Sequence, residues 1–407
     1  MTTASGDDTG PGDGPDPDGL ADLTDLAADL VRVPTENPPG DERPGAEFVV
    51  EWFEERGIDA RLVEAPDPER AQAVAWVGEN PETAPDDSPT LVLNGHLDVV
   101  PAGDPESWTR DPFGGTVEDG VLYGRGSADM KTGLALAMLT LRDLAPEIES
   151  GNLDGSLVFH AAMGEETGAP GTRTLLDEGY GGDRAVVLEP TDFRVGTAAK
   201  GVVTYRVGVS GSASHASRPD QGVNAIDAAR PVLAAIDDYD DRLREREDPL
   251  VGKAYATVTE FEAGTDSNMA VLPGRAEFLL DRRILPDETI ETVEAEIEDL
   301  LAGVERAAGV ETDRSLVKHY ASAGIPADHS LAERFRDLSA EMADAPREPW
   351  GLEAATDARE FVARGTPAII WGPGELAQAH TVDEHIDLGD AVAGLEILKK
   401  GVRETLS

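Results

Sequence analysis

Short apolar runs alternate with longer helical stretches through most of the chain. The apolar runs are AVAWVG (73–78), TLVLNG (90–95), SLVFHAAM (156–163), RAVVLEP (184–190) and TPAIIWG (366–372). One stretch that favours a helix begins at Leu20, and three others cover residues 45–58, 130–145 and 172–180. Strands that alternate with helices predict an open α/β sheet with substantial parallel content, flanked by helices.

The pattern changes near Lys200. Four alternating or apolar segments favour strands (200–211, 255–264, 274–285 and 314–321), and two favour helices (224–243 and 289–309). Their order is that of a βαββαβ unit. We therefore expect an inserted α+β lid or dimerisation domain at 200–321, a main domain formed by 20–199 and 322–407, and a disordered acidic tail at 1–19.

The chain is strongly acidic. It has 34 Lys and Arg against 81 Asp and Glu, a formal net charge of −47. Such a charge disfavours binding to nucleic acid and to anionic membranes, and it resembles the composition of halophilic proteins that work in high salt. An acidic surface that binds a cationic partner is the alternative explanation.

The absence of cysteine and of long hydrophobic segments further limits the class of protein. The absence of cysteine excludes disulfides, thiolate metal ligands and cysteine nucleophiles. The N-terminal residues lack the basic and apolar regions of a signal peptide, and no apolar run is long enough for a membrane span. We expect a cytoplasmic protein.

Potential metal ligands follow the apolar runs of the main domain. The residues at these strand ends are His96, Asp98, Glu165, Glu166, Glu189 and His380, and Asp129 opens a helix. Because ligands of open α/β sheets bind beyond the carboxyl ends of strands, we expect these side chains to converge. Nitrogen and oxygen donors of this kind suit zinc and also accept cobalt or manganese.

The histidines carry most of this inference. With 81 acidic residues among 407, a carboxylate near a strand end is common, whereas the chain has only seven histidines. His160 lies within an apolar run and is predicted to be a core residue. The remaining histidines outside the predicted site, His319, His329 and His385, are predicted to lie on the surface.

Several motifs resemble those of a known enzyme family. They are, in chain order, GHLDVVP, RDPFGGTVEDGVLYGRGSADMKTG, GEETGAPGTRTLL, LEPT, GSASHASRPDQGVNAI, LDRRILP, TDAR and AHTVDEHI, and the resemblance runs from about residue 20 to the C-terminus. They are similar to the dinuclear-metal deacylase and peptidase family that contains acetylornithine deacetylase, succinyl-diaminopimelate desuccinylase, aminoacylase and glutamate carboxypeptidase. The resemblance implies a zinc-peptidase-like catalytic domain.

The resemblance also implies roles for the strand-end residues. One of two divalent metal ions, most favourably zinc, would be held by His96 and Glu189, and the other by Glu166 and His380. Asp129 would bridge the two ions. Asp98 would accept the far N–H of His96 and fix the ring, as acceptors behind metal-bound histidines do. Glu165 would be the general base.

Substrate contacts are implied as well. His215 of the inserted domain would donate a hydrogen bond to the oxyanion, often from a partner subunit. Arg283 and Arg359 are candidates to pair with a substrate carboxylate; the alternative for each is a surface ion pair. The family commonly has Asn where this chain has Ala270, and Asn268 is the candidate for that amide, with its role left open.

These features favour a metal-dependent amidohydrolase that removes an acyl group from an N-acyl amino acid in arginine or lysine biosynthesis. An exopeptidase or dipeptidase of the same family is the alternative enzyme and would need the same metals and base. A non-catalytic binding module on this scaffold is a third hypothesis. The expected partners are a small N-acyl amino acid or short peptide and, through the inserted domain, a second copy of the chain.

Overall fold

The apolar runs of the main domain form one mixed sheet. The structure, a computed structural model, describes residues 17–83, 88–168, 170–264 and 269–407. The sheet has nine strands in the order β1-β2-β6-β3-β7-β17-β8-β15, with β16 beside β8. The strands are β1 (Asp59–Val63), β2 (Gln72–Val77), β3 (Thr90–His96), β6 (Ser156–Ala162), β7 (Arg184–Val187), β8 (Gly196–Ala199), β15 (Ala323–Gly324), β16 (Trp350–Leu352) and β17 (Ala368–Ile370).

The centre of the sheet is parallel. Strand β3 pairs in parallel with both β6 and β7, and β7 pairs in parallel with β17. The edge pairs β1–β2 and β2–β6 are antiparallel. The predicted fold class, a mixed α/β sheet flanked by helices, is confirmed, and the sheet is partly parallel, because β8 also pairs in antiparallel fashion with β15 and β17. Because β3, β6 and β7 run in the same direction, their carboxyl ends meet at one edge of the sheet.

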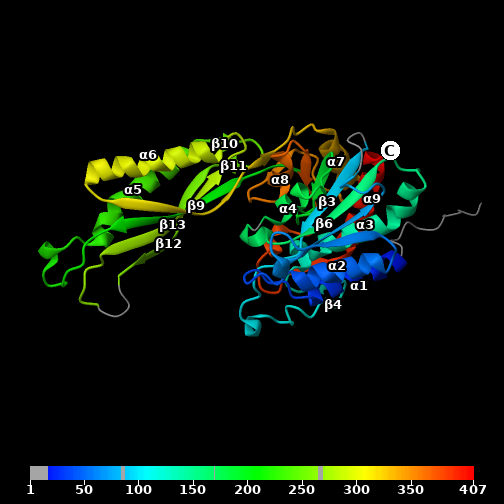
Figure 1. Cartoon of the computed structure of the whole chain (residues 1–407), viewed down its shortest axis with the longest axis horizontal. Coiled ribbons are helices and arrows are strands. Elements are labelled where there is room, and N and C mark those ends of the chain that lie inside the picture. Colours follow the sequence, from blue (N-terminus) through cyan, green and yellow to red (C-terminus); the bar gives the residue numbers. More distant parts are fainter. Residues whose placement is uncertain (1–16, 84–87, 169, 265–268) are drawn as a thin grey trace, which may run out of the picture.

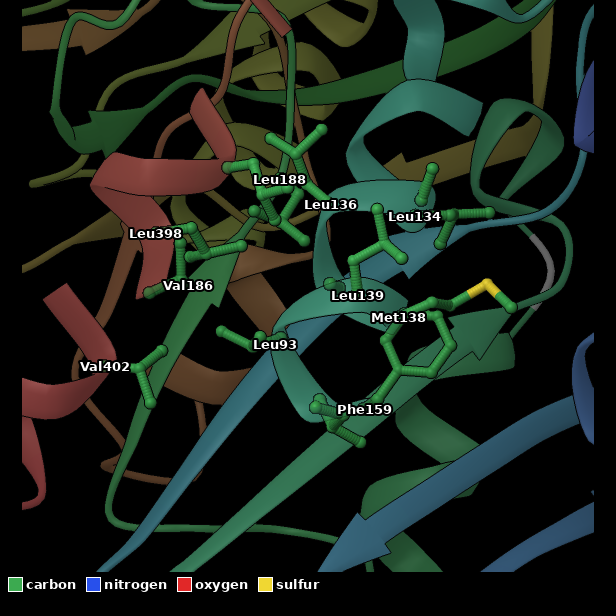
Figure 2. Close-up of a cluster of buried hydrophobic side chains, with 14 of the residues drawn as sticks. Leu93, Leu134, Leu136, Met138, Leu139, Phe159, Val186, Leu188, Leu398 and Val402 are labelled. Carbon is green, nitrogen blue, oxygen red and sulfur yellow. The ribbon is translucent and has the colours of Figure 1, made fainter. Parts of the chain in front are cut away.

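Helices cover both faces of this sheet. On one face lie α1 (Pro17–Arg32), α2 (Arg43–Glu54), α3 (Thr132–Glu149), α7 (Ser330–Ala343) and α9 (Leu388–Thr405), and on the other α4 (Gly171–Asp177) and α8 (Ala358–Val362). Side chains of β3 alternate between the two faces, so Leu93 packs in the larger core and Val92 in the smaller. Figure 2 shows α3 lying across the strands, with Leu139 near Leu93 and with Leu398 and Val402 of α9 beside them.

The start of the first helix differs from the expectation. Helix α1 begins at Pro17, so the last three residues of the predicted tail at 1–19 are helical. A proline at the first helical position is favourable because its missing N–H needs no partner there. Residues 1–16 lie outside the described part of the chain.

A second sheet forms a lobe of its own (Figure 1). It is antiparallel in the order β12-β13-β9-β14, formed by β9 (Gly201–Ser210), β12 (Tyr255–Ala263), β13 (Arg275–Ile284) and β14 (Thr312–Tyr320). Helices α5 (Ala225–Leu243) and α6 (Ile290–Ala308) pack on one face, against Val203 and Tyr205. We call this the lid lobe and propose 200–321 as the bounds of an inserted domain.

Smaller elements complete the chain. A three-stranded sheet is formed by β4 (Thr116–Glu118), β5 (Val121–Tyr123) and β18 (His385–Asp387), and a short hairpin by β10 (Glu247–Asp248) and β11 (Gly252–Lys253). Among the described residues, no helix is both long and apolar enough to cross a bilayer.

The large negative charge predicts that stability depends on salt. With a net charge of −47, the carboxylates of the folded protein repel one another. Added salt shortens the screening length from about 10 Å at 0.1 M to about 3 Å at 1 M. We therefore expect the thermal unfolding midpoint, followed by circular dichroism, to rise by several degrees when KCl is raised from about 0.1 M to about 2 M. Sodium chloride at the same ionic strength should give a similar rise, and a midpoint that changes with neither salt would contradict this explanation.

Candidate metal centre and active site

His96 and Asp129 meet at the carboxyl end of β3. His96 is the last residue of β3, and Asp129 lies in the turn Ser127–Lys131 that leads into α3. The Nε2 atom of His96 is 3.2 Å from Oδ1 of Asp129, and both side chains are almost completely buried. The strand and the helix start therefore bring together two residues that are 33 positions apart.

Glu166 and His380 complete the cluster from two other segments. Glu166 lies in the turn Glu165–Thr167 after β6, and His380 follows β17 in a loop, with a φ angle of +63°. His380 Nε2 is 3.0 Å from Oε2 of Glu166 and 3.5 Å from Oδ2 of Asp129. The two carboxylate oxygens of Asp129 thus face different imidazoles, the arrangement that a bridging ligand requires.

Glu189 lies in the same cavity. It follows β7, is 7% exposed, and lines a cavity of about 330 Å³ together with His96, Asp129, Glu166 and His380. All five residues predicted as metal ligands are therefore brought to one cavity. Ligand atoms of His96, Asp129 and Glu166 lie within 4.8 Å of one another.

The donor set fits divalent cations. Within the described part of the chain, no Lys or Arg forms an ion pair with Asp129, Glu166 or Glu189. Burial, reinforced by the Asp129 carboxylate, raises the pKa of Glu189 well above its usual range. Burial alone would lower the pKa of His96, but the Asp129 and Asp98 carboxylates raise it well above normal. Three crowded, buried carboxylates whose ion-pair partners among the described residues are two imidazoles at most are costly, and bound cations would remove that cost.

Glu165 lies beside the cluster and has a different environment. Burial, together with the Asp357 carboxylate, raises the pKa of Glu165 to about 8. Its Oε1 is 3.5 Å from Nη1 of Arg359, and its side chain lines the cavity. A buried carboxylate with a raised pKa beside the predicted metal ligands is suited to accept and return a proton.

Asp98 contacts the cluster differently from the expectation. The Nδ1 atom of His96 is 2.8 Å from the main-chain carbonyl of Asp98, whereas the nearer carboxylate oxygen is 3.6 Å away. The carboxylate instead accepts hydrogen bonds from the backbone N–H groups of Glu165 and Glu166, each at 3.1 Å, and from the Asn37 amide at 2.8 Å. Asp98 therefore holds both the imidazole and the turn that carries Glu165.

Replacing Asp98 by Asn should lower kcat about 10- to 100-fold. An amide nitrogen would face at least one backbone N–H of Glu165 or Glu166 and displace the turn, because both groups are donors. Steady-state kinetics should show the loss in kcat rather than KM. Asp119→Asn, an exposed position with no side-chain hydrogen bond among the described residues, is the matched control. An equal loss in both variants would contradict the positioning role.

The sequence interpretation missed Glu384. This buried carboxylate accepts hydrogen bonds from the backbone N–H groups of Gly126, Ala128 and Asp129 and pairs with Arg125 at 2.6 Å. It thereby fixes the loop that presents Asp129 to the histidines. Its position in the AHTVDEHI motif was the available signal, but an acidic residue in so acidic a chain gives little information by itself.

The four residues predicted to contact the substrate are placed differently. Arg283 lines the cavity, and its Nε donates to Asp281 at 2.8 Å. Arg359 is buried behind the cavity and contacts Asp357 at 2.9 Å as well as Glu165, so it is placed to hold these carboxylates. His215 is exposed after the outer end of β9, roughly 30 Å along that strand from its inner end, and does not line the cavity. Asn268 lies outside the described residues.

The other histidines follow the expectation in part. His160 is fully buried within β6, where its Nε2 is 2.7 Å from the Tyr180 carbonyl, as expected of a core residue. His319 is exposed. His329 and His385 are partly buried, and the His329 ring accepts a hydrogen bond from the Leu331 N–H at the start of α7.

Comparison with known proteins identifies relatives along most of the chain. The profile of Peptidase family M20/M25/M40 matches residues 92–404. A probable succinyl-diaminopimelate desuccinylase of Staphylococcus epidermidis is 29% identical over 399 residues, covering 89% of this chain and 92% of the relative. Acetylornithine deacetylase of Shigella sonnei is 30% identical over 346 residues, covering 84% and 85%.

A solved structure shares the same fold. The M20 family metallo-carboxypeptidase of Sulfolobus solfataricus superposes with a TM-score of 0.76 over 94% of this chain and 99% of its own length. Its sequence identity is 16%, so the likeness concerns the fold. The superposition extends over both the sheet that carries the cavity and the lid lobe.

Proposed function

Because the chain belongs to Peptidase family M20/M25/M40, a family of metal-dependent hydrolases of amide bonds, we propose that it removes the acyl group from an N-acyl amino acid. One observation carries the proposal: a cluster of two imidazoles and several carboxylates shares its cavity with the guanidinium of Arg283. The cluster suits metal ions, and a guanidinium suits the carboxylate of an amino acid. The two relatives described above are named for desuccinylation and deacetylation, which supports the same reaction class.

We propose that two divalent cations, most favourably zinc, are held by His96 with Glu189 and by Glu166 with His380, with Asp129 between them. The described donors are nitrogen and oxygen atoms only, which suits zinc, cobalt or manganese. Bound cations supply Lewis acidity toward water and toward the amide carbonyl.

The residues around this centre would then transfer the proton, position the base and bind the substrate. Glu165 takes a proton from the attacking water and returns it to the leaving amine nitrogen. Asp98 holds the backbone of the turn that carries Glu165, and Arg359 keeps Glu165 and Asp357 in place. Arg283 orients the substrate by pairing with its carboxylate.

His215 supports a proposal about assembly. It lies too far along the lid lobe to reach the cavity in this arrangement, so it would act after lid closure or from a second copy of the chain. The free edges of the lid sheet are β12 and β14, which could pair with another lid. A mass in solution of twice 43.0 kDa would support a homodimer, and a monomer at micromolar concentration would contradict it.

The function is tested by turnover in high salt with added zinc or cobalt. The panel is N-acetylornithine, N-succinyl-diaminopimelate, several N-acetyl amino acids and several dipeptides. We expect one or a few acylated amino acids to be hydrolysed, and chelation of the metal to abolish the activity. Hydrolysis of dipeptides alone would replace the proposal with an exopeptidase or dipeptidase. A protein that binds no metal and hydrolyses no amide would be a binding module.

A further inference from the structure

Lys318 differs from most lysines of this chain. Of the six lysines, four have an oxygen partner: Lys131 with the Val33 carbonyl, Lys200 with Glu353, Lys399 with Asp143 and Glu396, and Lys400 with Glu341. Within the described residues, Lys253 and Lys318 form no ion pair or hydrogen bond through their side chains. Of these two, Lys318 lines the cavity that also contains the proposed metal ligands.

The strand register places Lys318 in an ordered wall of this cavity. Val202 on β9 lies opposite both Arg283 on β13 and Tyr320 on β14. Two residues further along β9, Thr204 lies opposite Asp281 on β13 and Lys318 on β14. Residues directly opposite each other in a sheet share a face, and positions two apart share it as well.

This wall is the face of the lid sheet that carries no helix. Val203 and Tyr205 point to the opposite face, where α5 and α6 cover them. The same face of the lid sheet carries the buried hydroxyl of Thr204, which has no hydrogen-bond partner among the described residues. The inner end of the lid sheet therefore presents Arg283, Lys318 and Tyr320 to a cavity whose other wall is rich in carboxylates.

The cationic side chains in and near this wall differ in the partners that they already have. The Nε of Arg283 donates to Asp281, which leaves its two terminal nitrogens for a ligand. Arg359, which does not line the cavity, has its guanidinium carbon 4.3 Å from the centre of the Tyr320 ring and forms an ion pair with Asp357. The ammonium of Lys318 lies 5.5 Å from the centre of the same ring and carries no counter-ion among the described side chains.

Two separate cations suit two anionic groups. The strands of Arg283 and Lys318 are separated by β9, so their backbones lie roughly 10 Å apart. One carboxylate fills the fork of a guanidinium and leaves the lysine without a partner. In a chain with a net charge of −47, an unpaired lysine that lines the reaction cavity also attracts anions locally where the rest of the surface repels them.

We infer that Lys318 binds a second anionic group of the substrate, so that the preferred substrate is an N-acyl amino acid with at least two carboxylates. This inference rests on the proposed deacylase function and specifies its substrate class. The second carboxylate belongs either to a dicarboxylic acyl group or to the side chain of an acidic amino acid. In both cases the ammonium group of Lys318 would pair with a carboxylate.

The test compares matched substrates in Lys318→Gln. The substrates are N-acetylnorleucine, with one carboxylate, N-succinylnorleucine, with the second on the acyl group, and N-acetylglutamate, with the second on the side chain. We expect the wild type to favour at least one dicarboxylate by about tenfold or more in kcat/KM. Lys318→Gln should lose about 10- to 100-fold on that substrate, mainly through KM, and little on N-acetylnorleucine.

Two further variants separate binding from folding. Lys318→Arg, which keeps the charge, should recover most of the loss. Lys253→Gln, the other lysine without an ion pair in the described part of the chain, lies outside the cavity and should behave as wild type. A wild type without preference for dicarboxylates, or equal losses of Lys318→Gln on all three substrates, would overturn the inference while leaving the deacylase function intact. Hydrolysis of dipeptides but of no acylated amino acid would instead reject the proposed function, and the inference with it.

Discussion

Glu165→Gln should reduce kcat by about 10²- to 10⁴-fold while the protein stays folded and retains its bound metal. Glutamine has the same shape but accepts no proton at neutral pH, so the step assigned to Glu165 loses its base. The backbone N–H of residue 165 still donates to Asp98, and the side chain has no contact with either histidine among the described hydrogen bonds. Single-turnover kinetics and metal analysis of the purified variant measure the two effects separately.

The neighbouring carboxylate provides the control. Glu166→Gln makes the same chemical change one residue later, at a side chain 3.0 Å from His380 Nε2. It should lower the amount of bound metal as well as kcat, because an amide is a much weaker ligand than a carboxylate. If Glu165→Gln also loses metal, or keeps its turnover within about threefold of the wild type, the division of roles between the two residues is wrong.

Glu384→Gln should destabilise the protein by about 3 kcal/mol and weaken metal binding about 10- to 100-fold. The carboxylate accepts three backbone hydrogen bonds and pairs with Arg125, all in a buried environment. In glutamine, one of the two terminal atoms becomes a donor that faces other donors, so buried N–H groups lose their acceptor. The loop that presents Asp129 would then shift away from the histidines.

This prediction is checked with two measurements on the same variant. Denaturant unfolding of the metal-free protein gives the loss of stability, and calorimetric titration with zinc gives the change in affinity. Glu375→Gln, an exposed position nine residues earlier, should change neither. Lower stability with unchanged zinc affinity would show that Glu384 supports the fold without positioning Asp129.

The local elements could be predicted well because their signals are local. Continuous apolar runs such as TLVLNG became the central strands β3, β6 and β7, which helices cover on both faces. The alternating segments after Lys200 became the lid sheet with its two helices. The sequence interpretation did not find the short strands β8, β16 and β18, because three or four residues carry too little periodicity and are extended only through pairing with distant segments.

The candidate site could be predicted in part for the same reason. Placing polar residues at the carboxyl ends of parallel strands was enough to expect His96, Glu166 and Glu189 together, and the structure brings them to one cavity. The contacts that these three residues make with their neighbours could not be predicted from the sequence. Arg359 was a candidate to pair with a substrate carboxylate, with an ion pair as the alternative, and in the structure it contacts Glu165 and Asp357. Its orientation depends on how α8 packs, which no spacing in the chain encodes.

Residue type, order and periodicity determined the fold class and the strand-end donors, because a strand's direction fixes which end its following residues occupy. The amino-acid sequence also determined the charge and therefore the expected dependence on salt. Only the tertiary structure decided which carboxylate oxygen meets which nitrogen. The Asp98 carboxylate accepts hydrogen bonds from two backbone N–H groups, Glu384 accepts one from a residue 255 positions away, and Lys318 lines the same cavity as the imidazoles and carboxylates of the candidate site. Such choices follow from the competition of many buried donors for few acceptors, which is resolved only when the whole chain is packed.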